Sequence, residues 1–231
     1  MSKLLLLMFS FLTLSAIGQE DALKTDWANL KRFAAENSQL PLPRPHEQRV
    51  VFMGNSITEG WSRIDSAFFA GKPYINRGIG GQTTPQMLVR FRADVIDLKP
   101  AVVVILAGIN DIAENTGPTT LEAIFGNLVS MAELACANNI RPVLCSVLPA
   151  YTFPWRPHLQ PAEKVIALNA MIKDYCEKQN IVYVDYFSAM VDERKGLDKR
   201  YTNDEVHPTL AGYKVMAPLV EAGIAKAIKK K

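Results

Sequence analysis

The stretch "AVVVILAG", from Ala101 to Gly108, is an unbroken apolar run in which half of the residues are β-branched. A strand with one face in water alternates polar and apolar residues, whereas a continuous apolar run suits a strand covered on both faces. Strands of that kind lie in parallel sheets, where the connecting helices pack on the two faces. This run therefore predicts an interior strand of an α/β sheet.

Outward from this run, strand and helix patterns alternate along the chain. Four other segments predict strands: Arg49–Met53, Tyr74–Asn76, Pro142–Pro149 and Ile181–Phe187. Five segments predict helices. Two of them cover about Ile57–Phe69 and Pro85–Leu98, and the other three begin at a capping box formed by Thr119 and Glu122, at Pro161 and near Thr209. Pro218 should kink or split the last of these helices. The pattern predicts a three-layer, flavodoxin-like α/β sandwich of about five parallel strands with helices on both faces.

The N-terminus predicts a targeting segment. Lys3 precedes the apolar stretch Leu4–Leu14, and the small residues Ala16 and Gly18 follow it. This order is typical of a secretory signal peptide, and the stretch is too short to span a bilayer as a helix. We expect cleavage after Gly18, one domain over residues 19–231, a secreted or periplasmic location and no stable membrane insertion. The alternative is a buried N-terminal helix.

Charge and cysteine content favour no further partner. The net charge is +3, and the dense basic run Lys229–Lys231 ends a predicted helix, where cations complement the helix dipole. We therefore expect no nucleic-acid partner, and no pattern indicates an oligomeric state. Cys136, Cys145 and Cys176 form neither a disulfide framework nor a C-x-x-C pair, so we expect small buried side chains and no metal site.

Polar residues and glycines follow the predicted strands at the points where they end. Ser56 follows the first strand, Gly80 and Gly81 the second, and Asn110 the third, while the loop Asp204–His207 follows the fifth. Parallel sheets bind ligands at the carboxyl ends of their strands, so these residues should gather at one edge.

Ser56 becomes a nucleophile only if a base takes its proton, and the usual base is a histidine oriented by a carboxylate. His207 has Asp204 three residues before it. A turn there would place the carboxylate on Nδ1 and leave Nε2 free for Ser56. His46 precedes the first strand, and we expect no chemical role for it.

Acyl transfer also needs donors for the developing oxyanion. The backbone amides of Ser56 and Gly81 and the side-chain amide of Asn110 are the candidates. Each also has a purely structural interpretation. Ser56 could cap the next helix, Gly80 and Gly81 could form a tight turn, and Asn110 could cap a helix or hold a turn.

Four blocks in this order resemble the SGNH, or GDSL-type, hydrolase superfamily: "GNSITEGW", "NRGIGGQTT", "AGINDIAEN" and "DEVHP". The resemblance covers nearly the whole chain after Gly18. It implies that Ser56 is the nucleophile, His207 the base and Asp204 its orienter, and that Ser56, Gly81 and Asn110 form the oxyanion hole. It also implies catalysis without a metal or cofactor. The branch with the most similar blocks contains secreted carbohydrate acetylesterases and platelet-activating-factor acetylhydrolase subunits.

One position departs from this pattern. The superfamily commonly has aspartate where this chain has Asn55, which keeps an acceptor, adds a donor and loses the charge. The chain has no G-x-S-x-G, so the nucleophile elbow of α/β-hydrolases does not apply.

The alcohol part of the substrate is indicated by a second set of residues. The loop Phe153–Pro161 carries Trp155, Arg156 and His158, and an aromatic ring beside a guanidinium suits a sugar. Trp155 could equally anchor a lid on the core. Trp61, like Glu59, follows the nucleophile and could line the pocket or only pack.

Three functions remain open from the sequence. The first is a secreted serine esterase that removes short acyl groups, most simply acetyl, from carbohydrate, with an acylated small molecule or polysaccharide as its expected substrate. The second is a lipid-directed acylhydrolase, lysophospholipase or thioesterase. The third is a non-catalytic glycan-binding relative.

Overall fold

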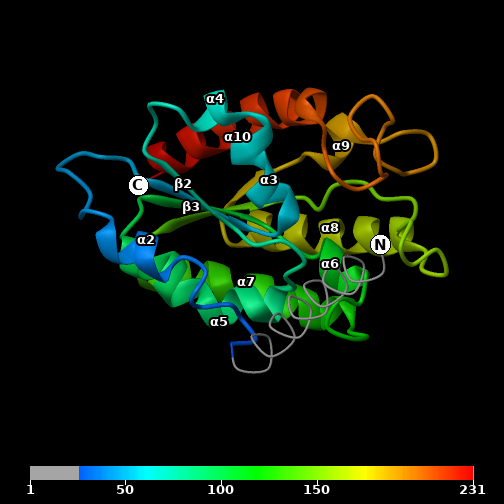
Figure 1. Ribbon diagram of the computed structural model, residues 1–231, viewed down its shortest axis with the longest axis horizontal. Coiled ribbons are helices and arrows are strands. Elements are labelled where there is room, and N and C mark those ends of the chain that lie inside the picture. Colours follow the sequence, from blue (N-terminus) through cyan, green and yellow to red (C-terminus); the bar gives the residue numbers. More distant parts are fainter. Residues whose placement is uncertain (1–25, 231) are drawn as a thin grey trace, which may run out of the picture.

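A computed structural model describes residues 26–230 of the 231-residue chain. Five parallel strands form one sheet between the helices (Figure 1). The strand order is β2-β1-β3-β4-β5. The strands are β1 Val50–Gly54, β2 Tyr74–Gly78, β3 Val102–Leu106, β4 Arg141–Cys145 and β5 Val182–Val184. This is the flavodoxin-like strand order, so the predicted fold class is confirmed.

The centre of the sheet is dry, as the apolar runs predict. Every residue of β1 and β3 is buried, and the two strands pair in register from Val50 opposite Val102 to Gly54 opposite Leu106. Both strands therefore need a helix layer on each face.

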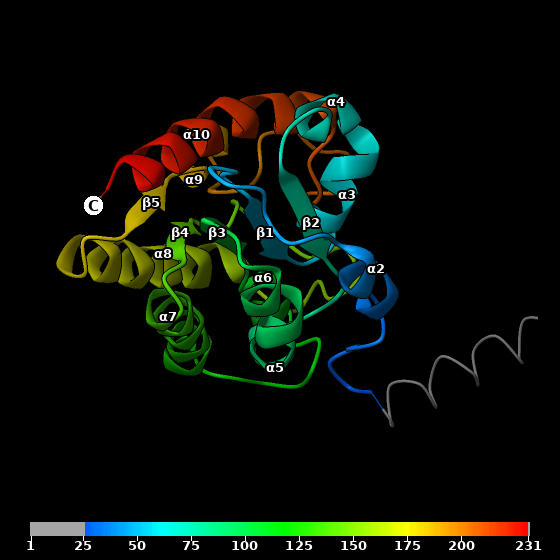
Figure 2. The same cartoon turned by 90° about the vertical axis from the view of Figure 1, so that its left-hand side faces the viewer.

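Helices supply these two layers (Figure 2). One face carries α3 Ser56–Ile64, α4 Ser66–Phe69, α9 Phe187–Met190 and α10 Leu210–Lys229. The other face carries α5 Thr84–Asp94, α7 Leu121–Ala137 and α8 Pro161–Lys178. The remaining elements are α2 Ala34–Gln39, which contacts α5, the single-turn α6 Ile109–Ile112 and a 3-10 turn at Ile96–Leu98.

Several predicted boundaries were wrong. The helix expected over Ile57–Phe69 is two helices, because Asp65 takes a non-helical conformation and is held by Lys214 Nζ at 2.8 Å. The helix α10 continues through Pro218 without splitting. Proline removes one backbone hydrogen bond, and α10 still packs along β3, β4 and β5.

The capping and cysteine predictions also need correction. The helix α7 begins at Leu121, so its cap is Thr120, whose Oγ1 accepts from the Ala123 amide at 3.2 Å. A capping box does occur at the start of α5. Cys145 and Cys176 are buried as expected, and burial raises the pKa of both thiols to about 12. Cys136 is exposed, because it lies on the outer face of α7 near its end.

The sequence feature interpreted as a signal peptide, residues 1–18, lies outside the described residues. Among residues 26–230, no helix has both the length and the apolar composition to cross a bilayer.

Candidate active site

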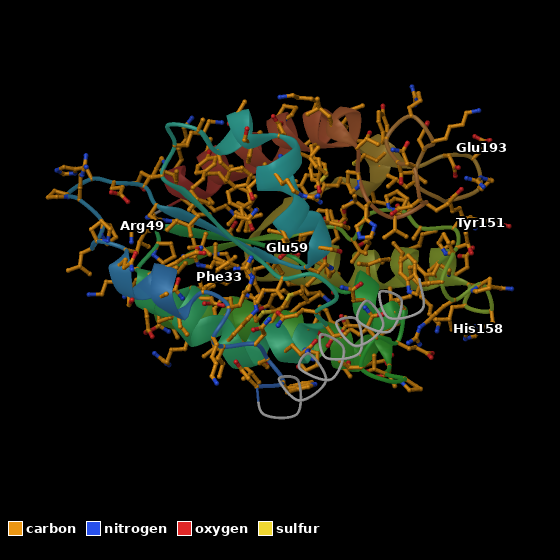
Figure 3. The ribbon with its side chains drawn as sticks, viewed as in Figure 1. Phe33, Arg49, Glu59, Tyr151, His158 and Glu193 are labelled. Atoms are coloured by element: carbon orange, nitrogen blue, oxygen red, sulfur yellow. The ribbon has the colours of Figure 1, made fainter. Side chains whose placement is uncertain are left out.

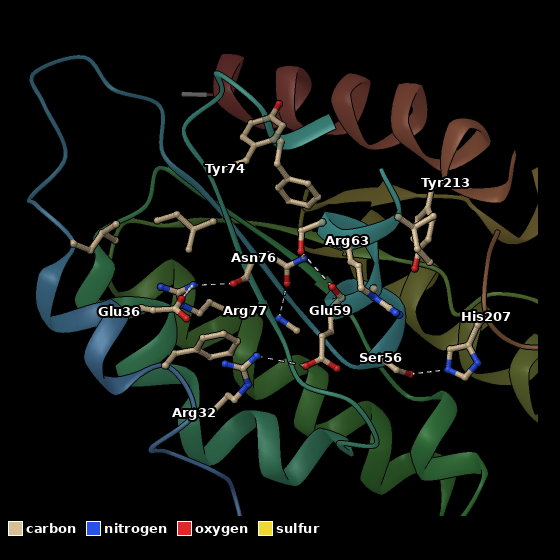
Figure 4. Close-up of a pocket in the computed structure, with 18 of the residues that line it drawn as sticks. Arg32, Glu36, Ser56, Glu59, Arg63, Tyr74, Asn76, Arg77, His207 and Tyr213 are labelled. Atoms are coloured by element: carbon tan, nitrogen blue, oxygen red, sulfur yellow. Dashed lines mark hydrogen bonds and ion pairs between the residues drawn. The ribbon is translucent and has the colours of Figure 1, made fainter. Parts of the chain in front are cut away.

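Ser56, His207 and Asp204 form one hydrogen-bonded series at the carboxyl ends of the strands (Figure 4). Ser56 Oγ lies 2.9 Å from His207 Nε2, and His207 Nδ1 lies 2.7 Å from Asp204 Oδ2. The structure therefore brings together the three side chains that the sequence predicts as nucleophile, base and orienter. In this geometry Nδ1 donates to the carboxylate, and Nε2 is free to accept the serine proton.

The Asp204–His207 turn is built by the aspartate itself. Asp204 Oδ1 accepts from the backbone amides of Val206 at 3.0 Å and His207 at 2.7 Å, and Glu205 takes a left-handed φ of 71°. Aspartate favours such turns because its short side chain bonds the backbone just after it. One oxygen of Asp204 thus shapes the loop while the other orients the imidazole.

Opposing effects set the charge of Asp204. Partial burial raises its pKa, but hydrogen bonds from the His207 amide and ring and from the Val206 amide outweigh burial and hold the pKa below 3.8. The carboxylate is therefore ionised at neutral pH, the state that stabilises an imidazolium at His207.

Ser56 is presented by a sharp change of direction at the end of β1. A Cβ on Gly54 would lie 2.0 Å from Thr58 Oγ1 and 2.9 Å from the Leu106 carbonyl oxygen, so only glycine fits there. Asn55 is the N-cap of α3, and its Oδ1 accepts from the Ile57 amide at 3.1 Å. Aspartate, usual at this position, could make the same cap. Asn55 Nδ2 is buried without a hydrogen-bond partner among the described residues.

The three predicted oxyanion donors lie on neighbouring strand ends. Ser56 is the first residue of α3, where the backbone amide has no acceptor within the helix. Gly81 has a left-handed φ of 76°, and Gly80 lies beside Ser56, where a Cβ would be in ordinary van der Waals contact with the serine Cβ at 3.9 Å. Asn110 is buried, and its Nδ2 donates to the Gln82 carbonyl at 2.9 Å. That bond fixes the amide and leaves its second N–H for another acceptor.

Several residues that hold these donors carried no recognisable sequence signal. Arg90 is fully buried and donates to Gln82 Oε1 at 2.6 Å and to the Gly54 carbonyl at 3.1 Å, which ties two strand ends together. Glu59 Oε2 accepts from the Gly80 amide at 2.9 Å. The sequence shows that Glu59 is three residues after Ser56, but it does not show where the Gly80 loop lies. The bond between Glu59 and the Gly80 amide therefore could not be predicted from the sequence.

A cavity of about 1030 Å³ opens beside Ser56 and His207. It runs along α3 and the outer edge of β2, and the segment before β1 supplies part of its wall, including Arg32 and Phe33 (Figure 4). Trp61 does not line it. That prediction was wrong, because Trp61 is 2% exposed and stacks on Phe68 in the core.

The other predicted substrate contacts lie outside this cavity. His158, on the loop after β4, is at one extremity of the molecule, away from Glu59 in the cavity wall (Figure 3). Trp155 is 47% exposed, and its ring lies 5.3 Å from the buried ring of Phe153. The loop is thus anchored on the core, and a substrate contact by Trp155, Arg156 or His158 stays a prediction.

The remaining histidine, His46, is exposed on the loop before β1. Within residues 26–230, no group of three or more His, Cys, Asp or Glu side chains is arranged to hold a metal ion.

Comparison with known proteins defines the class. The model of the GDSL-like lipase/acylhydrolase family matches residues 52–215, and the chain belongs to this family. Membership supports a carboxylic ester hydrolase. A crystal structure of a GDSL-like lipase from Bacteroides thetaiotaomicron is similar, with 53% sequence identity, a TM-score of 0.85, and coverage of 87% of this chain and 98% of the other.

More distant relatives share less of the chain. The uncharacterized lipoprotein YqeF of Bacillus subtilis is 35% identical over 88 residues, which cover 37% of this chain and only 36% of that protein. An acetylxylan esterase from Geobacillus stearothermophilus has the same fold, with a TM-score of 0.59 and 20% identity over 77% of this chain and 94% of the other.

Proposed function

We propose that the protein is a secreted serine esterase that removes short acyl groups, acetyl above all, from carbohydrate. The observation that carries this proposal is the series Ser56–His207–Asp204, with contacts of 2.9 and 2.7 Å at the mouth of a cavity. A module that only binds glycan needs no such hydrogen-bonded series. The geometry of Ser56, His207 and Asp204 therefore favours catalysis over binding alone. Secretion rests on the signal-peptide pattern of residues 1–18.

In the proposed mechanism, Ser56 Oγ attacks the carbonyl carbon while His207 Nε2 takes the hydroxyl proton. The amides of Ser56 and Gly81 and the Nδ2 of Asn110 hold the oxyanion that forms. The imidazolium, oriented and stabilised by Asp204, then protonates the departing alcohol. Water, activated by the same His207, attacks the acyl-serine and releases the acid and the free Ser56 hydroxyl.

The walls of the cavity combine charged and apolar side chains. Arg32, Arg63 and Arg77 all line the cavity that Ser56 opens into. Phe33, Leu40 and Ile75 also line the cavity and offer apolar surface, where a fatty chain would gain about 0.8 kcal/mol per buried methylene. The guanidinium groups are the feature that supports a polar alcohol. The fold shared with the acetylxylan esterase is consistent with this proposal. The alternative is a lipid-directed acylhydrolase or thioesterase.

The proposal is tested with p-nitrophenyl acetate, butyrate, octanoate and palmitate. A pocket of acetyl size should give the highest kcat/KM at acetate or butyrate, because longer chains no longer fit beside Ser56. A lipase pocket should instead improve with every added methylene. A maximum at octanoate or beyond would replace the proposal with the lipid alternative.

Ser56→Ala is the matched control, because it removes only the Oγ. It should hydrolyse none of these esters above background while unfolding at the wild-type temperature. Turnover by Ser56→Ala close to that of the wild type would remove the serine mechanism.

A further inference from the structure

We propose, building on the esterase function above, that the alcohol part of the substrate carries a carboxylate, as an acidic sugar does, and that Arg63 binds this group. The inference starts from the size of the cavity. Its volume of about 1030 Å³ is at the upper end of ordinary ligand pockets, and an acetyl group occupies only a small part of it. Most of the space therefore belongs to the alcohol.

One face of α3 connects the nucleophile to Arg63. Ser56, Glu59, Gly60 and Arg63 all line the cavity, and their spacing of three, four and seven residues places them along one side of the helix. Seven residues correspond to a rise of about 10 Å, and helical side chains lean toward the N-terminus. Arg63 therefore leans back toward Ser56, and Figure 4 shows its side chain on the cavity side of α3.

The opposite wall comes from a segment that the family match, residues 52–215, does not include. This segment contributes Arg32 and Phe33 to the cavity. It is fixed in place, because the Ala28 carbonyl accepts from Gln82 Nε2 at 2.8 Å and Asn37 Nδ2 donates to Asp94 Oδ1 at 2.7 Å. The wall is thus fixed in place, although it lies outside the residues of the family match.

Two of the three arginines in the wall are already engaged. Phe33 lies between them, with the Arg32 and Arg77 guanidinium carbons 4.8 and 4.6 Å from its ring centroid. Arg77 pairs with Glu36 at 3.4 Å, and Arg32 pairs with Glu59 at 3.8 Å.

Arg63 differs from these two arginines. Across residues 26–230, the carboxylate pairs of the cavity wall involve Arg32 and Arg77 but not Arg63. Asp204 also lines the cavity, and its carboxylate is bound to His207. Arg63 is exposed, and among the described residues it is the wall arginine with no carboxylate partner. A guanidinium group can bind a carboxylate with two parallel hydrogen bonds.

The test uses two substrates that differ only in this charge. One is a set of mono-O-acetylated methyl glucuronosides, and the other is the same set with the carboxylate converted to a carboxamide. Acetate release is measured at pH 7 in low salt. The wild type should have a kcat/KM about fivefold higher for the acid than for the amide, which is the size of one partly exposed ion pair. Salt at roughly 0.5 M should reduce this preference.

Arg63→Gln should abolish the preference, because kcat/KM for the acid should fall about fivefold, to the value for the amide. Arg92→Gln is the matched control. It removes the same charge from an exposed arginine on α5 that does not line the cavity, and it should keep the preference.

Equal rates on acid and amide, or a preference that survives in Arg63→Gln, would overturn the inference. So would hydrolysis of p-nitrophenyl acetate without acetate release from either sugar. In each of these cases the esterase proposal survives. Failure to hydrolyse any ester, p-nitrophenyl acetate included, would instead contradict the proposed function itself.

Discussion

Asn110 shows how one side chain can serve the fold and the chemistry together. Its Nδ2 donates one hydrogen to the Gln82 carbonyl at 2.9 Å, and the side chain is 6% exposed. The amide therefore cannot rotate freely, and its second hydrogen has a fixed direction. A donor held in this way needs no reorganisation when negative charge develops on a carbonyl oxygen.

Asn110→Ala should lower kcat for p-nitrophenyl acetate by roughly 10²–10³, the usual effect of one oxyanion donor. KM should change little, because the hydrogen bond strengthens only as the oxygen gains charge. Steady-state kinetics separates the two constants. A raised KM with an unchanged kcat would show that Asn110 binds the ground state of the substrate instead.

The identity of the site residues could be predicted from the sequence because chain order and strand ends carry it. Ser56 directly follows an apolar run, and Asp204 and His207 are close enough in sequence to form their turn locally. Trp61 could not be placed in the same way. It is four residues from Ile57, and these two side chains share the core-facing side of α3, whereas Ser56 and Glu59 are only partly covered.

At the scale of elements, the site depends on contacts between segments far apart in the sequence. Arg90 on α5 bonds the Gly54 carbonyl at the end of β1 and the side chain of Gln82, which follows Gly81. The Gln82 carbonyl in turn accepts from Asn110 after β3. One buried arginine thus fixes the relative positions of three strand ends. No sequence pattern predicts this network, because it joins residues whose proximity exists only in the folded sheet.

Gln82→Ala should therefore lower kcat about 10–100-fold with little change in KM, because the loop that carries the Gly81 donor loses the bond between Arg90 and the Gln82 side chain and shifts. Asp94→Asn is the control. Asp94 pairs with Arg90 Nη1 at 2.9 Å and accepts from Asn37 Nδ2, and neither bond involves Gly54 or Gln82.

Asp94→Asn should reduce the urea midpoint and keep kcat near that of the wild type, because breaking a buried ion pair costs stability. Equal kcat in Gln82→Ala and wild type, or equal loss in both variants, would show that the network has only a structural role.

At the scale of the whole molecule, the strand order was predictable and the cavity was not. Alternating apolar strands and helical patterns specify a doubly wound sheet, and ligands bind where its strand order reverses, here between β1 and β3. The outer wall of the cavity comes from residues 26–40, whose sequence has no strong periodicity. Its position depends on bonds from Gln82, Gln86 and Arg77 to that segment.

Asp111 links this architecture to the stability of the whole chain. Its carboxylate is 3% exposed and accepts from the Thr84 hydroxyl at 2.6 Å and the Thr84 amide at 3.0 Å, which joins α6 to the start of α5. Burial raises the pKa of Asp111 to about 6, although the bonds from Thr84 oppose this shift. In the unfolded chain the carboxyl returns to its ordinary pKa of 3.8.

Between these two values the folded state holds a proton that the unfolded chain has lost. Raising the pH from about 4 to 6 should therefore lower the contribution of Asp111 to the free energy of unfolding, by roughly 3 kcal/mol in total.

Asp111→Asn has no such titration. The unfolding free energy of the wild type minus that of Asp111→Asn should thus decrease over this window and level off above pH 6, measured by urea unfolding at pH 4, 5, 6 and 7. Asp198→Asn is the control, because hydrogen bonds from Arg200 lower the pKa of the partly exposed Asp198 to about 2. The difference between wild type and Asp198→Asn should stay flat from pH 5 to 7. The prediction would be contradicted if the unfolding free energy of the wild type minus that of Asp111→Asn were constant or rose with pH. That result would show that solvation or hydrogen bonds stabilise the Asp111 carboxylate in the fold more than its burial implies.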